Sequence, residues 1–125
     1  MSKRAITSDK LAPLAGPFSS AIVSGELVYL SGQVAQDPHT GKLINGDVRA
    51  QTDQIFRNLS VVLEAAGMTL ANVLRVGVFL TDIKDFAAMN EIYARHFSQP
   101  YPARTCIGVA ALPLGAQVEM DVVAG

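Results

Sequence analysis

The sequence predicts an α+β fold, in which one mixed β-sheet carries two helices on a single face. Three observations support this prediction. Short alternating apolar runs of strand length occur near both ends and in the middle of the chain, and two longer segments, 48–66 and 86–97, have helical periodicity. A strand-like run separates the two helical segments. At 125 residues the chain is long enough for one domain, 1–125, and too short for two.

The N-terminal third is expected to supply the first strands. One short strand is placed around 5–7, before an irregular segment rich in Pro, Ala and Gly. Two apolar runs, 21–23 and 27–31, then flank Ser24, Gly25 and Glu26. Glycine at the centre of that spacing predicts a tight hairpin turn.

The middle of the chain alternates helix and strand. Apolar residues recur at helical spacing over 48–66, where Asp47 is a suitable N-cap and Gly67 a suitable C′ residue. Residues 74–80 alternate in polarity as a strand does. Segment 86–97 is the second helix, whose buried side we expect to comprise Phe86, Met89, Ile92, Tyr93 and Phe97.

Two strand-like runs joined by a turn at 112–115 are expected to close the chain as a hairpin. If that turn closes symmetrically, Cys106 lies opposite Glu119 and Arg104 lies opposite Asp121. Side chains of directly paired residues share a face of the sheet. The sequence therefore predicts a cation beside one or two carboxylates, which suits a small anionic ligand.

The two faces of the sheet are expected to differ. Alternate residues of the last run, 118–122, would turn toward the helices, whereas Arg104, Cys106 and Glu119 would lie on the opposite face. Nothing in the chain remains to cover that second face. Either water or another copy of the protein is expected to cover it.

Composition narrows the classes of partner. Half of the residues are apolar, 17% are charged, and the formal net charge is −1, which gives no electrostatic case for nucleic acid or an anionic membrane. One cysteine and the lack of a signal-like or bilayer-length apolar run favour a cytoplasmic protein. His39, His96 and Cys106 lack metal-ligand spacing, so no metal is expected.

The residues alone leave the chemistry open. Arg104 could hold a carboxylate through its planar fork, or it could form a structural ion pair with Glu119 or Asp121. Glu119 could act as a general base, or it could be a solvated side chain that faces outward. Cys106 has no histidine near it in sequence, so a buried thiol is a better interpretation than a nucleophile. Taken without further information, these residues indicate a small α+β domain with a candidate anion site.

Seven short motifs occur in order between residue 16 and the C-terminus: GPF (16–18), YLSGQ (29–33), EAAG (64–67), FAAMNEIY (86–93), PARTC (102–106), LP (112–113) and VEM (118–120). Together they resemble the Rid family, the reactive intermediate deaminases also called the YjgF family. The resemblance implies a chorismate-mutase-like fold and a homotrimer, in which three sheets form a central barrel with a ligand cleft at each subunit interface. It also implies hydrolysis of short 2-imino acids and their enamine tautomers to 2-keto acids and ammonium, without a cofactor.

The resemblance assigns roles to individual residues. Arg104 would grip the substrate carboxylate, and backbone groups at Cys106 would contact the substrate. Glu119 would position the attacking water and exchange protons with it. Ser31 and Asn90 match positions that line or support the cleft.

One position departs from the family pattern, because Phe18 stands where Tyr is common. Its ring can still wall the pocket, but one hydroxyl donor is missing, which puts the substrate preference in question. A pathway-specific deaminase of aminoacrylate-type or aminomuconate-type enamines is therefore an alternative. A non-catalytic small-carboxylate binder is another. A chaperone or ribonuclease activity ranks last, because the sequence has no basic groove or stacking platform.

Overall fold

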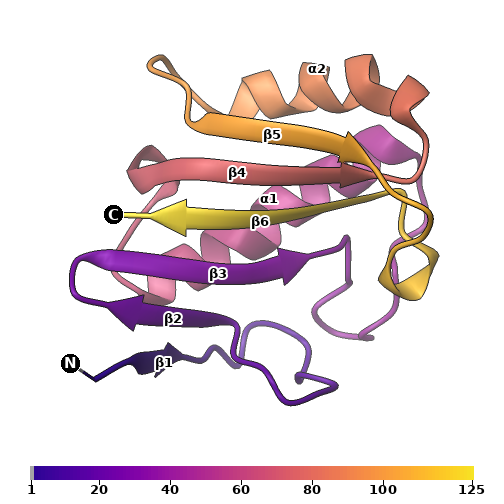
Figure 1. Cartoon of the computed structure of the whole chain (residues 1–125). Coiled ribbons are helices and arrows are strands. Elements are labelled where there is room, and N and C mark those ends of the chain that lie inside the picture. Colours follow the sequence, from indigo (N-terminus) through magenta and orange to yellow (C-terminus); the bar gives the residue numbers. More distant parts are fainter. Residues whose placement is uncertain (1) are drawn as a thin grey trace.

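Six strands form one mixed sheet, and both helices pack on the same face of it (Figure 1). This computed structural model describes residues 2–125. The strands lie in the order β1-β2-β3-β6-β4-β5 across the sheet. Their bounds are β1 Arg4–Ile6, β2 Ala21–Ser24, β3 Leu27–Gln33, β4 Val73–Leu80, β5 Ala103–Gly108 and β6 Val118–Ala124; the helices are α1 Val48–Ala65 and α2 Phe86–His96. The predicted fold class is confirmed.

Helix α1 begins and ends where the sequence predicts. The side chain of Asp47 accepts a hydrogen bond of 3.1 Å from the backbone N–H of Ala50, so it caps the first turn. Gly67 follows the helix with φ at +75°, a conformation that glycine adopts without a Cβ clash. The predicted hairpin between β2 and β3 is also present, with Gly25 at φ +59° in its two-residue turn.

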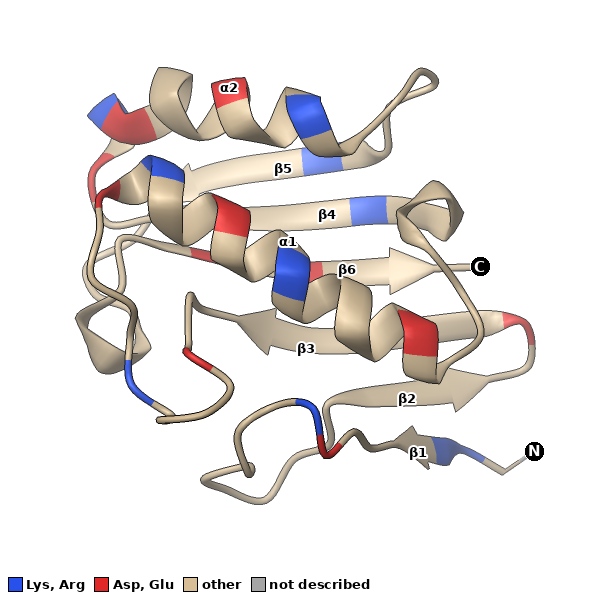
Figure 2. Ribbon diagram, turned by 180° about the vertical axis from the view of Figure 1, so that it is seen from behind, with Lys and Arg blue, Asp and Glu red and all other residues tan. Residues whose placement is uncertain are grey.

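The hydrophobic core lies between the helices and one face of the sheet. Helix α1 contributes large, fully buried side chains, and the central strands β4 and β6 supply their partners. Figure 2 shows both helices in front of the sheet, with charged positions spaced along α1. Alternate residues of β6 point into this core, as predicted; they are Val118, Met120, Val122 and Ala124.

The predicted hairpin between the last two strands is wrong, because β4 lies between β5 and β6. Strand β5 pairs with β4 in parallel, which follows from the helical crossover through α2. Strand β6 pairs antiparallel with β4 on one side and with β3 on the other. The segment 109–117 is long enough to carry the chain past the end of β4. Because β6 is central in the sheet, its backbone groups have partners along both edges. Its alternate apolar residues are correspondingly buried.

The position of β4 also separates the residues that were expected to share a face. Arg104 pairs with Val76 and Cys106 pairs with Val78, so both side chains lie on the helix side of the sheet. Glu119 lies on the uncovered face, as predicted. The expected opposition of Cys106 to Glu119, and of Arg104 to Asp121, does not occur.

None of the helices in residues 2–125 combines the length and the apolar character needed to cross a bilayer.

Candidate functional site

Arg104 lies on the edge strand β5, with its guanidinium against helix α2. Its Nη1 donates a hydrogen bond of 2.6 Å to Asn90 Oδ1. Its Cζ lies 4.8 Å from the ring centroid of Tyr93 and 5.4 Å from that of Phe86. Positions 86, 90 and 93 follow one another by four and three residues, which places them on one face of α2. That face holds the arginine through one hydrogen bond and two aromatic contacts.

A cavity of about 390 Å³ opens beside this arginine. Arg104 and Asn90 supply its charged and amide groups, and Tyr93 and Pro102 supply its apolar walls. The mixture of an arginine with aromatic and apolar groups suits a small molecule that carries a carboxylate.

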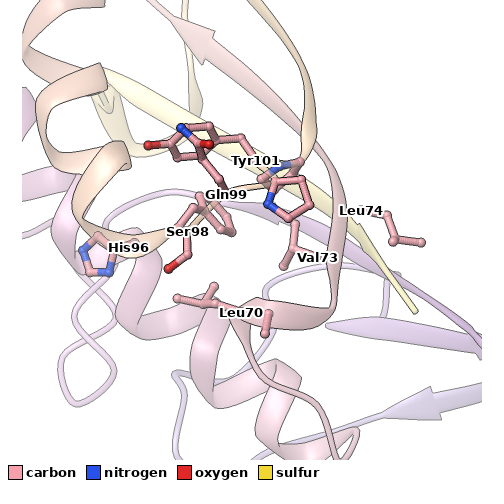
Figure 3. Close-up of a pocket in the computed structure, with 11 residues that line it drawn as sticks. Leu70, Val73, Leu74, His96, Ser98, Gln99 and Tyr101 are labelled. Carbon is pink, nitrogen blue, oxygen red and sulfur yellow. The ribbon is translucent and has the colours of Figure 1, made fainter.

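A larger cavity of about 620 Å³ lies behind the segment that leads into β5 (Figure 3). Figure 3 shows His96, Ser98 and Gln99 on one side of it and Leu70 and Val73 on the other. None of the predicted site residues lines this cavity. The candidate site is therefore the smaller one.

Cys106 lies two residues beyond Arg104 on the same side of β5 and packs against the core. Burial raises the pKa of its thiol, and the positive charge of Arg104 acts in the opposite direction. Since the thiolate is the nucleophilic form, a raised pKa disfavours covalent chemistry at this residue.

Glu119 lies on the uncovered face of β6, beside Gly32 of β3. A Cβ atom built on Gly32 would stand 2.7 Å from Glu119 Oε2, so the carboxylate occupies the space that the glycine leaves. Burial raises the pKa of Glu119, and the negative charge of Asp121 raises it further. A carboxyl group whose pKa is raised toward neutrality is suited to accept and return a proton.

Ser31 precedes Gly32 on β3, and its hydrogen bonds connect it to the loop that carries Phe18. Strand β3 has a bulge between Leu30 and Gln33. There the hydroxyl of Ser31 donates to the carbonyl of Ser19 at 2.6 Å, and its N–H donates to Ser20 O at 3.0 Å. These bonds tie the bulge to the loop that carries Phe18, whose ring is 52% exposed.

The predicted site residues thus form two clusters in one chain. Arg104, Cys106 and Asn90 lie on the helix side of the sheet, whereas Glu119 lies on the other face, across β4, against Gly32, which follows Ser31 on β3. Asp121 does not pair with Arg104 and instead accepts a hydrogen bond of 3.1 Å from the Gly77 N–H.

The aromatic contacts of Arg104 were not predicted. Phe86 and Tyr93 were both predicted on the buried side of α2. Tyr93 is buried, but the prediction for Phe86 is wrong, because its side chain is exposed beside Arg104. Their helical spacing from Asn90 was the available signal. Among residues 2–125, no group of three His, Cys, Asp or Glu side chains could hold a metal ion.

Comparison with known proteins gives consistent matches over nearly the whole chain. The sequence profile of a family described as "Endoribonuclease L-PSP" matches residues 8–125. The human protein 2-iminobutanoate/2-iminopropanoate deaminase is 39% identical over 122 residues, which cover 98% of this chain and 89% of the human one.

Solved structures agree in fold. The crystal structure of RidA from an Antarctic Psychrobacter superposes with a TM-score of 0.92 and 42% identity, over 97% of this chain and 98% of that one. Escherichia coli TdcF with bound serine superposes with a TM-score of 0.90 and 32% identity, over 97% of each chain.

Proposed function

The chain belongs to the endoribonuclease L-PSP family, which is the Rid family that its motifs resemble, and on this premise we propose that it hydrolyses short-chain 2-imino acids and their enamine tautomers. The products are 2-keto acids and ammonia. The proposed substrates include 2-iminopropanoate, its tautomer 2-aminoacrylate, and 2-iminobutanoate. Removal of these reactive species would protect other proteins from them.

The geometry around Arg104 carries this proposal. Each substrate in the class has a carboxylate next to the reacting carbon. An arginine has five N–H donors, and among residues 2–125 only one bond from Arg104, to Asn90, is present. The exposed remainder of the guanidinium offers two parallel donors to a carboxylate, and such bonds are worth roughly 1.5–3 kcal/mol each.

The backbone of β5 supplies the next contacts. Strand β5 is an edge strand, so its outer side has no partner strand within residues 2–125. Backbone groups at Cys106 would contact the substrate there, without any reaction of the thiol.

Glu119 is proposed to position and activate the attacking water. As the water oxygen bonds to the imine carbon, the carboxylate takes one of its protons and the carbon becomes tetrahedral. The proton then passes to the nitrogen, and the carbon–nitrogen bond breaks. Ammonia leaves as the carboxylate of Glu119 takes the hydroxyl proton and the keto group forms. The iminium is already electrophilic, so correct placement of the water is most of the task.

Arg104 and Glu119 lie on different faces of one sheet, and this separation favours a site built from two copies. We propose a homotrimer in which Arg104 of one copy faces Glu119 of its neighbour across the interface. Ser31, next to the Gly32 that Glu119 contacts, and Phe18, on the loop bonded to Ser31, would then wall the same cleft. Phe18 presents a ring without a hydroxyl, which keeps a pathway-specific enamine substrate as the alternative within this reaction class.

The first test adds the protein to an amino-acid oxidase reaction that releases a 2-imino acid, and follows the keto acid formed. The wild-type protein should speed its release, and Arg104→Ala should abolish the effect because the carboxylate is no longer held. Arg57→Ala is the matched control, since Arg57 is exposed on α1 and its one ion pair within residues 2–125 is with Asp53. A folded Arg104→Ala protein with full activity would show that the carboxylate is held elsewhere.

A non-catalytic carboxylate binder is the second candidate, and the serine bound to Escherichia coli TdcF favours it. Glu119→Gln separates the two functions. A hydrolase should lose at least about tenfold in rate, because the amide cannot take a proton from water. A binder should show unchanged affinity for 2-oxobutanoate and no effect on imine lifetime in either protein.

A further inference from the structure

The aromatic support beneath Arg104 extends the proposed site into helix α2. We propose that Tyr93 is a positioning residue, whose ring fixes the plane of the Arg104 guanidinium so that its free edge meets the substrate carboxylate. This inference rests on the proposed function, because it concerns the same carboxylate site. It adds a residue from the core of the domain that acts on the substrate through Arg104.

The contacts of Arg104 restrict it in two different ways. The bond from Nη1 to Asn90 Oδ1, at 2.6 Å, fixes one corner of the guanidinium. That bond alone leaves the planar group free to rotate about it. The ring of Tyr93, with its centroid 4.8 Å from Cζ, lies against the guanidinium and removes that rotation. An exposed arginine otherwise samples many rotamers, and ordering them on ligand binding would weaken affinity.

Tyr93 is itself held firmly. Its side chain is only 6% exposed. Its ring packs edge-on to Phe56 at 5.7 Å between centroids and against Phe97 at 4.9 Å. Phe86, the second ring near Arg104, is 38% exposed and lies farther away, at 5.4 Å. Tyr93 is therefore the more rigid of the two supports.

The ring of Tyr93 carries this role, and its hydroxyl does not. The hydroxyl oxygen is buried and has no hydrogen-bond partner among residues 2–125. A buried hydroxyl without a partner costs stability, so its removal should not weaken the domain. Tyr93→Phe keeps the ring and removes only the hydroxyl, which makes it the conservative variant for the test.

The experiment compares Tyr93→Leu and Tyr93→Phe with Leu63→Ala in the full-length protein. Leu63 is fully buried in the same hydrophobic core, but it lies on α1 two turns beyond Phe56 and outside the aromatic cluster that holds Tyr93, so its variant measures the effect of core loss alone. The first readout is the NMR shift of the Arg104 side-chain protons, identified by their absence from Arg104→Ala. The second is the dissociation constant for 2-oxobutanoate, with the rate of imine hydrolysis at saturating substrate as the third.

We expect the Arg104 signals to show a ring-current shift in the wild type, to lose most of it in Tyr93→Leu, and to regain it in Tyr93→Phe. The dissociation constant should rise roughly 5- to 30-fold in Tyr93→Leu and return to within about twofold of the wild type in Tyr93→Phe. The saturated rate should change less than the affinity, because an equal loss of ground-state and transition-state binding leaves kcat largely intact. Tyr93→Met replaces the leucine variant if that one does not fold.

Two results would overturn the inference. One is the absence of a ring-current shift on the Arg104 side-chain protons of the wild type. This result can be obtained without any Tyr93 variant. The other is an equal loss of affinity in Tyr93→Leu and Leu63→Ala. If the wild type hydrolyses no imine but binds 2-oxobutanoate through Arg104, the proposed reaction fails, and the shift and affinity readouts still decide the role of Tyr93.

Discussion

Two glycines leave the space that the carboxylates of β6 occupy on the uncovered face of the sheet. The carboxylate of Glu119 lies where a Cβ of Gly32 would stand, and Asp121 Oδ1 lies where a Cβ of Gly77 would stand. Both carboxylates thereby lie against neighbouring strands and lose part of their contact with water. This partial desolvation is the larger cause of the raised pKa of Glu119, and the charge of Asp121 is the second.

Replacement of Asp121 by Asn should shift the pH dependence of activity. Without the neighbouring negative charge, the pKa of Glu119 falls, so the base stays ionised at lower pH. The acid limb of kcat/KM for imine hydrolysis should move to lower pH in Asp121→Asn, as measured across a pH series. Asp9→Asn, which removes an exposed charge far along the sequence, should leave the limb in place. An unmoved limb in Asp121→Asn would show that Asp121 does not set the proton affinity of Glu119.

The raised pKa of Glu119 also has a consequence for stability. The folded state holds this proton more tightly than the unfolded chain does. Between the ordinary pKa of a glutamate and the raised value, the folded state therefore binds more protons, and stability falls as pH rises through that window.

Helix α1 is the element on which the core depends, since it buries more large side chains than α2 does. Its N-terminus is stabilised by the Asp47 cap. Helix α1 is also bonded to the residue that precedes β6, because Gln51 Oε1 accepts a hydrogen bond of 2.9 Å from the Gln117 N–H. Two short polar contacts link α1 to α2: the ion pair of Arg49 with Glu91 at 2.7 Å, and the hydrogen bond between Asp53 Oδ1 and His96 Nε2 at 2.9 Å. These surface pairs add little free energy in comparison with the buried side chains between the helices.

Loss of the α1 cap should destabilise the domain measurably. Asp47→Ala leaves the Ala50 N–H without its acceptor and should lower the free energy of unfolding by about 1 kcal/mol. Asp47→Asn keeps an acceptor oxygen and should lose only a small part of that. Urea unfolding at a fixed protein concentration measures both, with an unchanged m-value as the sign that only stability has changed. Equal midpoints for Asp47→Ala and the wild type would contradict the capping role.

At the scale of the whole molecule, the main feature is the sheet face that no helix covers (Figure 1). Apolar side chains lie on it in the isolated chain; Tyr29 is 48% exposed and Ile107 is 45% exposed. A further copy that covered this face would bury these groups. In the proposed trimer it would also enclose Glu119, which lies on this face, against the β5 edge of a neighbour that carries Arg104.

The assembly should have a mass of three times 13.2 kDa in solution, which analytical ultracentrifugation measures directly. Val123→Lys places a charge on the uncovered face and should shift the protein toward monomer, with loss of imine hydrolysis because the cleft is then incomplete. Ala65→Lys, on the exposed surface of α1, is the control and should retain both mass and activity. A fully active monomer would contradict the proposed cleft between copies. Arg104 and Glu119 of one chain would then have to act without a neighbour.

The sequence by itself determined the elements whose signals are local. The helical stripe with its cap at Asp47 and its glycine at 67 predicted α1, and the turn at Gly25 predicted the hairpin of β2 and β3. Alternation along β6 placed Glu119 on the uncovered face. In each case neighbouring residues carry the information, because helix caps, turns and strand alternation depend on the residues next to them.

Only the tertiary structure decided which strands pair. A turn at 112–115 is compatible with a hairpin, but segment 109–117 is also long enough to pass β4, and no local pattern distinguishes the two. The outcome moved Arg104 and Cys106 to the helix side, beside Tyr93, and away from Glu119. Strand order depends on which arrangement buries the most apolar surface and satisfies the most backbone groups over the whole domain, and this is a property of distant residues together.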